Sequence, residues 1–487
     1  MEKEEEDEEV SWSCWLKTMF CGYGAMMVFI FNGTTEGQSA VLLPQLKQKD
    51  SLIPVTAEEE TWIASLGILL SPVSSLLIGT IVDVFGRKLG LLSFHICMGL
   101  GFGIIAFATE VWHIYAGRCI CGFALGLEVV AVVYLAETCT KKQRSVLLAF
   151  ISAAFVIGVL LAYVVGGYLP WNIASAILSL MCFLNFLLQL LAPESPAWLY
   201  KRGRPDASTR SLQKLGRSPE GIARELEMLR LSSKEQSEKF QLKVFLEPTV
   251  WKPFLILSFY HFLQAATGVY HFMYYTLDFI ERLGTTYDPL TVSLILSVIR
   301  VVINATLGMW ITARMSRRLA TVISSVGMCA SLIGMGVWEH VYRDTPVGAR
   351  NYDWLPIVLL NLYIIFGIIG VTTLPWLMSG EVFPLRVRGS MSGAVFVVAT
   401  GSMFVFIKSY DWSIETLGMS GLLFTFAAMS FLGIFLGAFF LPETQNKTLY
   451  EIERGFMSKS KRVATEWTAQ KPDINEEAQR EMPSGQG

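Results

Sequence analysis

Residues 134–144 read YLAETCTKKQR, and their pattern returns near the other end of the chain, where residues 378–388 read MSGEVFPLRVR. In both stretches a glutamate precedes an arginine by seven positions, and the glutamate follows an apolar run. One such motif is typical of a helix end whose long charged side chains reach back to the membrane surface. Two copies in matching places indicate an internal repeat.

Two further motif pairs recur in the same order along the chain. Residues 83–88, DVFGRK, correspond to residues 313–318, ARMSRR, and residues 193–195, PES, correspond to residues 442–444, PET. Chance is a poor explanation for three pairs in one order. The repeat therefore predicts two six-helix halves, with a binding site between them near the middle of the bilayer.

The composition indicates an all-α membrane protein. Hydrophobic residues make up 53% of the chain and charged residues only 16%, with a mean hydropathy of +0.47, and a soluble protein would carry more charge. Apolar runs of about 20 residues, enough to cross a bilayer, recur from end to end. We expect twelve transmembrane helices in two pseudo-symmetric bundles, near residues 19–45, 62–82, 89–109, 113–136, 146–169, 171–192, 251–280, 289–312, 319–341, 355–381, 390–412 and 416–441.

The loops between these spans fix the expected orientation. Lys and Arg gather in one set of loops, which should therefore be cytosolic and should place both termini in the cytosol. The acidic start, MEKEEEDEE, differs from the basic start of a cleaved signal peptide. The expected parts are an acidic N-terminal tail (1–18), an N-terminal bundle (19–192), a cytosolic linker with short helices (193–250), a C-terminal bundle (251–442) and a C-terminal tail (443–487).

The repeated charges all fall on the predicted cytosolic side, where carboxylates and guanidiniums can form bidentate pairs between the bundles. Such pairs would hold a cytosolic gate closed, and Glu381→Ala should then favour an inward-open state. The second half has Ala313 and Ser316 where the first has an acid and a glycine, so its lock should be weaker. The expected network comprises Asp83, Arg87, Glu137, Arg144, Glu194, Arg317, Glu381, Arg388 and Glu443.

The predicted seventh span contains an unusually polar stretch, QAATGVYHFMYYT, at residues 264–276. Lipid would penalise a polar helix face, so this one should line a cavity. A helix–helix seam that uses Gln and Tyr as interhelical hydrogen-bonding groups is the alternative. The residues that share this face at helical spacing are Gln264, Gly268, His271, Tyr275 and Asp278.

Several motifs together resemble the sugar porter family of the major facilitator superfamily. They are GRCICGFALG (117–126), PESPAWL (193–199), PWLMSGEVFPLRVRG (375–389) and LPETQNKTLYEIE (441–453). GQSAVLLPQL (37–46) and EEETWIASL (58–66) are most similar to the insect facilitated trehalose transporter-like branch. The resemblance implies alternating access, passive or proton-coupled, and a short cytosolic helical domain.

The resemblance also implies where substrate and gates lie. Ala265 and Tyr270 stand where the family has a second Gln and an Asn, so common hexoses should lose hydrogen bonds worth roughly 0.5–1.5 kcal/mol each. The expected substrate-binding residues are Gln264, Thr267, Tyr270, His271, Asn304, Trp376 and Ser152, and the expected gating residues are Tyr274, Tyr275, Glu36, Arg300 and Pro375.

Ionisable residues within the spans are functional candidates, because a charge at the bilayer centre is costly. We expect Glu36 and Arg300 to pair across the halves as an outer gate, or Arg300 to contact an anionic ligand; local pairing or snorkelling is the alternative. Glu128 is either a proton site or packs against a polar neighbour. Arg118 should form a structural pair, and Lys408 should snorkel.

The sequence predicts an alternating-access transporter of a sugar (hexose or trehalose-like) or related polyol at the plasma membrane, acting by facilitated diffusion. A same-fold carrier of an organic anion or other small polar ligand, a proton-coupled symporter and a non-transporting nutrient sensor are the alternatives. No P-loop, nucleophile triad or metal-ligand spacing occurs, so we expect neither an enzyme nor a metal or cofactor. The net charge of −2 suggests no nucleic-acid partner. The oligomeric state stays open.

Overall fold

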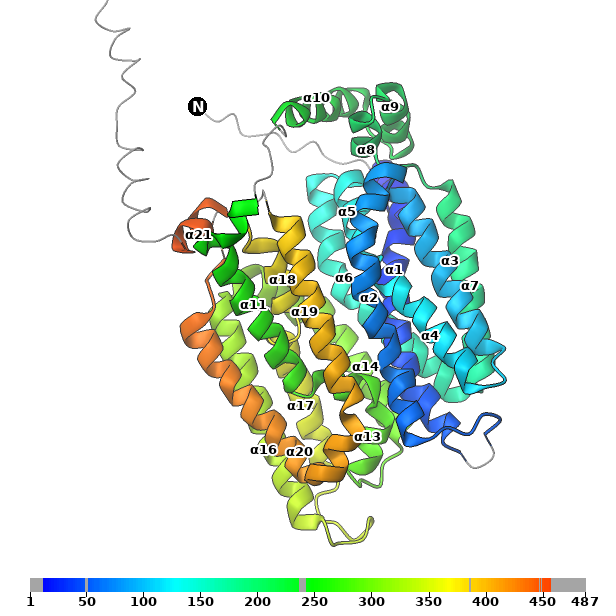
Figure 1. The fold of residues 1–487 in the computed structure, drawn as a ribbon, viewed down its shortest axis with the longest axis vertical. Coiled ribbons are helices and arrows are strands. Elements are labelled where there is room, and N and C mark those ends of the chain that lie inside the picture. The colour runs from blue at the N-terminus through cyan, green and yellow to red at the C-terminus, as the bar shows by residue number, and fades with distance from the viewer. Residues whose placement is uncertain are drawn as a thin grey trace, which may run out of the picture.

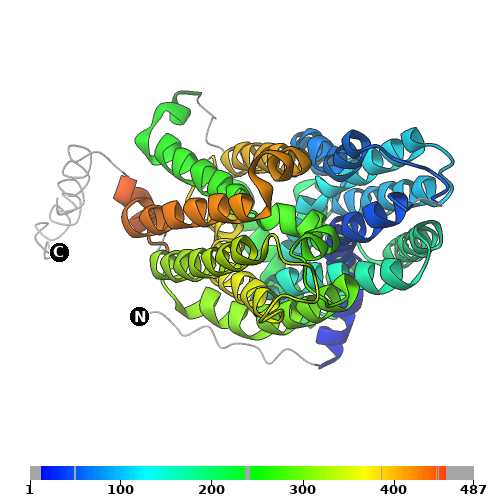
Figure 2. The same ribbon diagram turned by 90° about the horizontal axis from the view of Figure 1, so that it is seen from below.

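The computed structural model describes residues 12–48, 51–235, 242–384, 387–445, 447 and 449–456. Within these ranges every regular element is a helix. The helices form two halves that lie side by side, both in the front view and in the view from below (Figures 1 and 2). The blue-to-cyan helices of the first half occupy one side, and the green-to-orange helices of the second half occupy the other.

In the first half α1 packs against α6, and α3 packs against α7 and α4. The crossing of α1 and α6 is close because Gly33 lies against the Phe155 carbonyl and Gly158 lies against the Ile30 carbonyl, where a Cβ would overlap the backbone. The helices of this half are α1 (Trp12–Leu46), α2 (Ala57–Phe85), α3 (Arg87–Ala106), α4 (Val111–Leu125), α5 (Glu128–Thr138), α6 (Lys141–Tyr168) and α7 (Trp171–Leu191).

The second half repeats this packing. Here α11 packs against α19, and α16 packs against α20 and α17, as the repeat in the sequence predicts. Its elements are α11 (Pro248–Ala266), α12 (Val269–Tyr274), α13 (Thr276–Arg282), α14 (Pro289–Ile303), η2 (Asn304–Gly308), α15 (Met309–Arg314), α16 (Arg317–Tyr342), α17 (Leu355–Ile369), α18 (Leu374–Glu381), α19 (Arg388–Lys408), α20 (Tyr410–Phe435) and η3 (Leu436–Phe440).

Short helices connect the halves and lie at one end of the molecule, the top in Figure 1. They are α8 (Pro196–Lys201), α9 (Pro205–Lys214), α10 (Pro219–Glu235) and η1 (Leu242–Leu246), and α21 (Leu449–Phe456) lies at the same end. Residues 222–231, IARELEMLRL, whose apolar residues recur at helical spacing, fall inside α10. The start of α1 docks on this group, because the Thr18 hydroxyl donates to the Leu215 carbonyl at 3.3 Å.

Eleven helices in the described part of the chain are long and apolar enough to cross a membrane. The expected seventh span, 251–280, differs because it is divided into α11, α12 and α13 at Gly268 and Tyr275. Gly268 has φ +86°, a left-handed conformation that stops α11 and that side chains with a Cβ rarely adopt. Two tail boundaries also differ, since α1 already begins at Trp12 and α21 lies inside the expected C-terminal tail.

Candidate functional site

A cavity of about 310 Å³ lies between the two halves and is lined by side chains from both. Five of the seven expected substrate-binding residues line it: Ser152, Gln264, Tyr270, Asn304 and Trp376. Thr267 and His271 are not among its lining residues. The cavity also has lining residues that were not expected as substrate contacts, Asn32, Glu128 and Thr372 among them.

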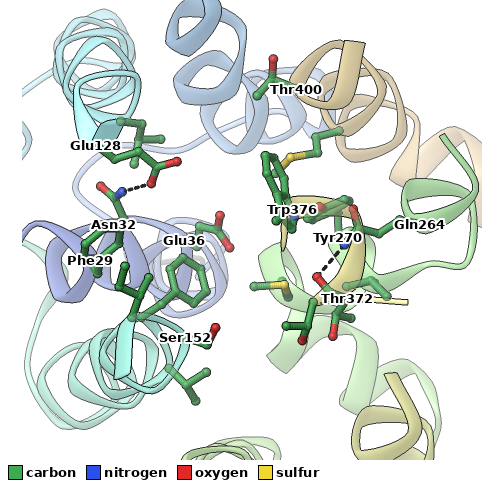
Figure 3. A pocket seen from close by; sticks show the side chains of 18 of the residues that line it. Phe29, Asn32, Glu36, Glu128, Ser152, Gln264, Tyr270, Thr372, Trp376 and Thr400 are labelled. Atoms are coloured by element: carbon green, nitrogen blue, oxygen red, sulfur yellow. Dashed lines mark hydrogen bonds between the residues drawn. The ribbon is translucent and has the colours of Figure 1, made fainter. Parts of the chain in front are cut away.

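The wall from the first half carries the acidic groups. Asn32 and Glu36 stand one turn apart on α1, so they project from the same side of the helix. Glu128 begins α5, directly after the interruption that separates α4 from α5, and accepts a 2.5 Å hydrogen bond from Asn32 Nδ2. Figure 3 shows these three side chains together with Ser152 on one side of the cavity. Glu128 thus has the polar neighbour that was one of its two expected roles.

The wall from the second half is built around Gln264. Its Nε2 donates to the Thr372 carbonyl at 2.9 Å, and its Oε1 lies 3.2 Å from Nδ1 of His261. The His261 ring meets Trp376 edge to face at 4.6 Å between centroids. Both ends of the Gln264 amide are therefore held by the protein, which fixes its direction at the cavity (Figure 3). The sequence interpretation missed His261, although its position three residues before Gln264 places both on one helix face.

Thr267 and His271, which were expected to bind substrate, lie on either side of the break at Gly268. The Thr267 hydroxyl donates to the Gln264 carbonyl at 2.7 Å, and the Thr267 carbonyl accepts from the Tyr363 hydroxyl at 3.0 Å. His271 is buried among aromatic rings and lies 5.2 Å from the Phe426 centroid. Both residues thus stabilise the broken helix rather than line the cavity.

A network of charged side chains joins the halves at the end opposite the short linker helices. Lys47 Nζ lies 2.7 Å from Glu60 and 3.4 Å from Asp278, so it bridges α1 and α2 of the first half to α13 of the second. Asp278 also accepts from Arg282 at 2.6 Å and from the Tyr410 hydroxyl at 2.9 Å. We call this network the outer seal: Lys47, Glu60, Asp278, Arg282, Tyr410 and Asp411, the last of which lies 3.9 Å from Arg282.

A second bridge reinforces the outer seal. Lys408 Nζ donates to the Thr61 hydroxyl at 2.7 Å and lies 4.3 Å from the centroid of the Trp62 ring. Lys408, which was expected to snorkel, thus has its ammonium held by an aromatic face and a hydroxyl of the other half.

The expected gating residues take different places. Tyr275 is buried and stacks on Tyr410 at 4.1 Å, directly under the outer seal. Tyr274 is buried in α12, and Pro375 is buried near the start of α18. Glu36 and Arg300 line the cavity, and among the described side chains no ion pair within 4 Å links them. The outer seal is therefore formed by other residues than this expected pair.

Further contacts also join the two halves. Tyr163 and Thr276 are joined through their hydroxyls at 2.8 Å, and Glu36, which lines the cavity, is hydrogen-bonded by Tyr274. The outer seal and the Lys408 bridge hold the halves together at the end opposite the short linker helices.

Where the structure describes both partners, the expected cytosolic ion pairs lie within each half. In the first half Arg87 meets Glu137 through Nε at 3.0 Å and through Nη2 at 3.1 Å, and Asp83 lies 3.1 Å from Arg87. Ser195 also hydrogen-bonds Glu137. In the second half Arg317 Nη2 lies 3.0 Å from Glu381. Arg144 and Arg388 contact backbone carbonyls, those of Ala136 and Phe383.

The repeated Pro-Glu motif acts as a helix cap. Glu194 accepts from the backbone N–H groups of Arg87 and Lys88 at 3.0 and 3.1 Å, and Glu443 accepts from that of Arg317 at 3.0 Å. A carboxylate is favourable there because the first N–H groups of a helix lack partners and carry partial positive charge. Burial raises the pKa of the Glu194 carboxyl above its usual range, although these backbone N–H groups oppose the shift.

Glu137→Gln is expected to lower the melting temperature. The substitution removes the charge of a carboxylate that Arg87 contacts with two nitrogens, and leaving a buried polar partner unmatched costs about 1–3 kcal/mol. Thermal unfolding of the purified protein measures the loss. Glu220→Gln, on the exposed face of α10, is the control, and a loss for Glu137→Gln no larger than that of the control would contradict a stabilising role for the pair.

Comparisons with known proteins agree with this architecture. The model of the family described as "Sugar (and other) transporter" matches residues 18–456. The Facilitated trehalose transporter Tret1 of Bombyx mori is 29% identical over 93% of this chain and 88% of its own length. The protein of the same name from Polypedilum vanderplanki is also 29% identical, over 91% of this chain and 88% of its own length.

Solved structures show the same fold at low identity. The proton:xylose symporter XylE, a protein of the major facilitator superfamily, matches with a TM-score of 0.68 and 19% identity over 89% of this chain and 99% of its own. The inward-open form of XylE from E. coli matches with a TM-score of 0.70 and 17% identity over the same shares. The chain has the major facilitator fold and belongs to the sugar transporter family.

Proposed function

We propose that this protein carries a sugar or a related polyol across a bilayer by facilitated diffusion with alternating access. The observation that carries the proposal is a cavity of about 310 Å³ between two repeated halves, sealed on one side by the Lys47–Asp278 bridge. In transporters built from repeated halves, one half rocks against the other around such a central site.

The cavity suits a ligand with both polar and apolar faces. Trp376 and Tyr270 offer aromatic surface, while Ser152 and Asn304 offer hydroxyl and amide groups. The Asn304 amide donates to the Arg300 carbonyl at 2.9 Å, which leaves its oxygen for a ligand. The names of the relatives support trehalose or a hexose as the first candidates.

The membrane and orientation are part of the proposal. The plasma membrane is the proposed site, and both termini are proposed to be cytosolic. The position of α8–α10 and α21 at one end, opposite the outer seal, supports this orientation. The Lys and Arg content of the linker loops supports it too.

Uptake by proteoliposomes that contain the purified full chain tests the proposed function. Saturable uptake of radiolabelled trehalose or glucose, with counterflow when the vesicles are preloaded, is the expected result. Uptake that survives an uncoupler indicates facilitated diffusion, and uptake that collapses indicates proton coupling. Binding without any uptake or counterflow would contradict transport and favour the sensor alternative.

Trp376→Ala is expected to raise the KM for the transported sugar by about tenfold, because an aromatic face against the sugar ring contributes roughly 0.5–1.5 kcal/mol beyond the area that it buries. The indole is 37% exposed and lines the cavity. Initial uptake rates at a series of sugar concentrations measure the change. Trp412→Ala, whose indole is 66% exposed at the start of α20, is the matched control. An unchanged KM for Trp376→Ala would contradict a sugar-binding role.

A further inference from the structure

The cavity has an acidic wall that the binding of a neutral sugar does not explain. Glu36 and Glu128 both line it, and Arg300 is the cationic residue among its lining side chains. Where the structure describes these residues, no ion pair within 4 Å joins Arg300 to either carboxylate. Two acids and one base give this lining a net charge of −1 when all three are ionised.

Buried acceptor atoms on this wall lack a hydrogen-bond partner. Asn32 is 3% exposed; its Nδ2 donates a hydrogen bond to Glu128, while its Oδ1 has no partner. Glu36 is 9% exposed, and its Oε2 has no partner, although Tyr274 hydrogen-bonds its carboxyl group. Buried polar atoms are normally satisfied, so such atoms at a cavity indicate that a ligand completes them. Both atoms accept hydrogen bonds, so the ligand must donate.

The opposite wall offers less polar recognition than the sequence suggested. The Gln264 amide is already held by His261 and the Thr372 carbonyl. Besides the Asn304 amide oxygen, that wall adds aromatic surface from Tyr270 and Trp376 (Figure 3). Aromatic faces attract a cation as well as the apolar face of a sugar.

The two nearby cations leave the acidic wall uncompensated in part. Arg300 offsets one carboxylate at most, and its Nε has no hydrogen-bond partner. Arg118 is buried with Nη1 on the Thr35 carbonyl at 3.0 Å and is not one of the lining residues. The second carboxylate therefore has no cation of its own, and its burial favours neutralisation, which a positively charged ligand or a proton can supply.

We propose that the substrate carries a protonated amine, as an amino sugar or aminated polyol does, and that its ammonium binds Glu36 with Asn32 and Glu128 beside it. An ammonium has three donors and no acceptor, which matches the unpartnered atoms of this wall. A charge-assisted hydrogen bond is also roughly twice as strong as a neutral one. The proposal rests on the proposed sugar transport, since it names the substrate class of the same cavity.

Calorimetric titration of the purified full chain tests the proposal. The monosaccharide ligands are D-glucosamine, N-acetyl-D-glucosamine and D-glucose, which differ in one substituent, and only the first of them carries a positive charge. Trehalosamine and trehalose give the same comparison for a disaccharide. At least one amine should bind about tenfold or more tightly than its neutral counterparts, as one charged hydrogen bond predicts. If neither amine binds more tightly than its neutral counterpart, the proposal is wrong, whatever the variants do.

Substitutions of single carboxylates identify the group that recognises the ammonium of the ligand. Glu36→Gln keeps the size of the side chain and should remove the preference for the amine over its neutral counterpart. Glu339→Gln, which neutralises a buried acid in α16 away from the cavity, should retain the preference. An amine preference that survives both Glu36→Gln and Glu128→Gln would overturn the assignment to this wall.

Proteoliposome uptake separates this proposal from the proposed function. Amine-selective binding without uptake of any ligand would support the acidic site and contradict transport. Saturable uptake of glucose or trehalose without amine preference would support transport and overturn the amine. Equal binding together with glucose uptake driven by an imposed proton gradient would also overturn it, because a proton would then occupy the carboxylates in place of the ammonium.

Discussion

Asp278→Asn is expected to open the outer side of the cavity, raising the population of the outward-facing state about tenfold. Asp278 accepts from Lys47 of the first half and from Arg282 and Tyr410 of the second. Asparagine keeps the size of the side chain and one acceptor, but it removes the charge that holds two cations. A hydrogen bond to a charged group contributes about 1.5–3 kcal/mol, and partial exposure reduces this to roughly the 1.4 kcal/mol that a tenfold shift needs.

The rate at which a membrane-impermeant maleimide added outside the cell modifies Ser152→Cys measures this shift. Ser152 lines the cavity, so its label reports access from the outer solution. Glu281→Gln is the matched control, because Glu281 is exposed on the same short helix, α13. Equal labelling rates in Asp278→Asn and in its parent would show that the outer seal does not hold this side closed.

The outer seal also marks a limit of sequence interpretation. Glu36 and Arg300 were expected to form the outer gate, because charges inside a span are functional candidates. Lys47 lies near a span end, where charges are ordinary, so nothing in the sequence separates it from a snorkelling side chain. Asp278 was expected on the polar face of the seventh span, but nothing in the sequence identified Lys47 as its partner. Their pairing depends on how the two halves are tilted relative to each other, and the sequence pattern does not predict this tilt.

The repeat predicted the fold but not the partners of its charged residues. Equivalent motifs imply equivalent surroundings, and the structure confirms this for Glu194 and Glu443, which both cap the helix after a cytosolic turn. Symmetry does not say whether Arg87 finds its carboxylate in its own half or in the other. The observed answer, its own half, requires the positions of α3 and α5 in space.

Only some of the cavity-lining residues were predicted, because the left-handed backbone conformation of Gly268 was not anticipated. The polar face from Gln264 to Asp278 was derived for an unbroken helix. The break at Gly268 turns the second part of the segment, so that Tyr270 lines the cavity while His271 packs among aromatic rings. Gln264 lines the cavity as expected, but the groups that hold it come from His261 and from the loop between α17 and α18, and only the folded chain brings them together.

Gly268→Ala is expected to lower both the melting temperature and the transport rate strongly. Gly268 has φ +86°, and a Cβ there would overlap the ring of Phe426. A left-handed residue with a Cβ costs roughly 1–2 kcal/mol, and overpacking typically costs a further 1–3 kcal/mol or so. Thermal unfolding and initial uptake rates measure the two effects. Gly401→Ala is the control, because a Cβ at that position in α19 meets open space.

A double variant separates the two causes of this loss. Phe426→Leu removes part of the ring that the new Cβ would meet, but it leaves the left-handed backbone at residue 268 unchanged. We expect Gly268→Ala with Phe426→Leu to recover the overpacking part of the stability and not the backbone part, and a double-mutant cycle gives the coupling. Full recovery would mean that the break needs only space. Stability of Gly268→Ala equal to that of Gly401→Ala would mean that residue 268 becomes helical, and α11 and α12 would then join into one helix that turns Tyr270 away from the cavity.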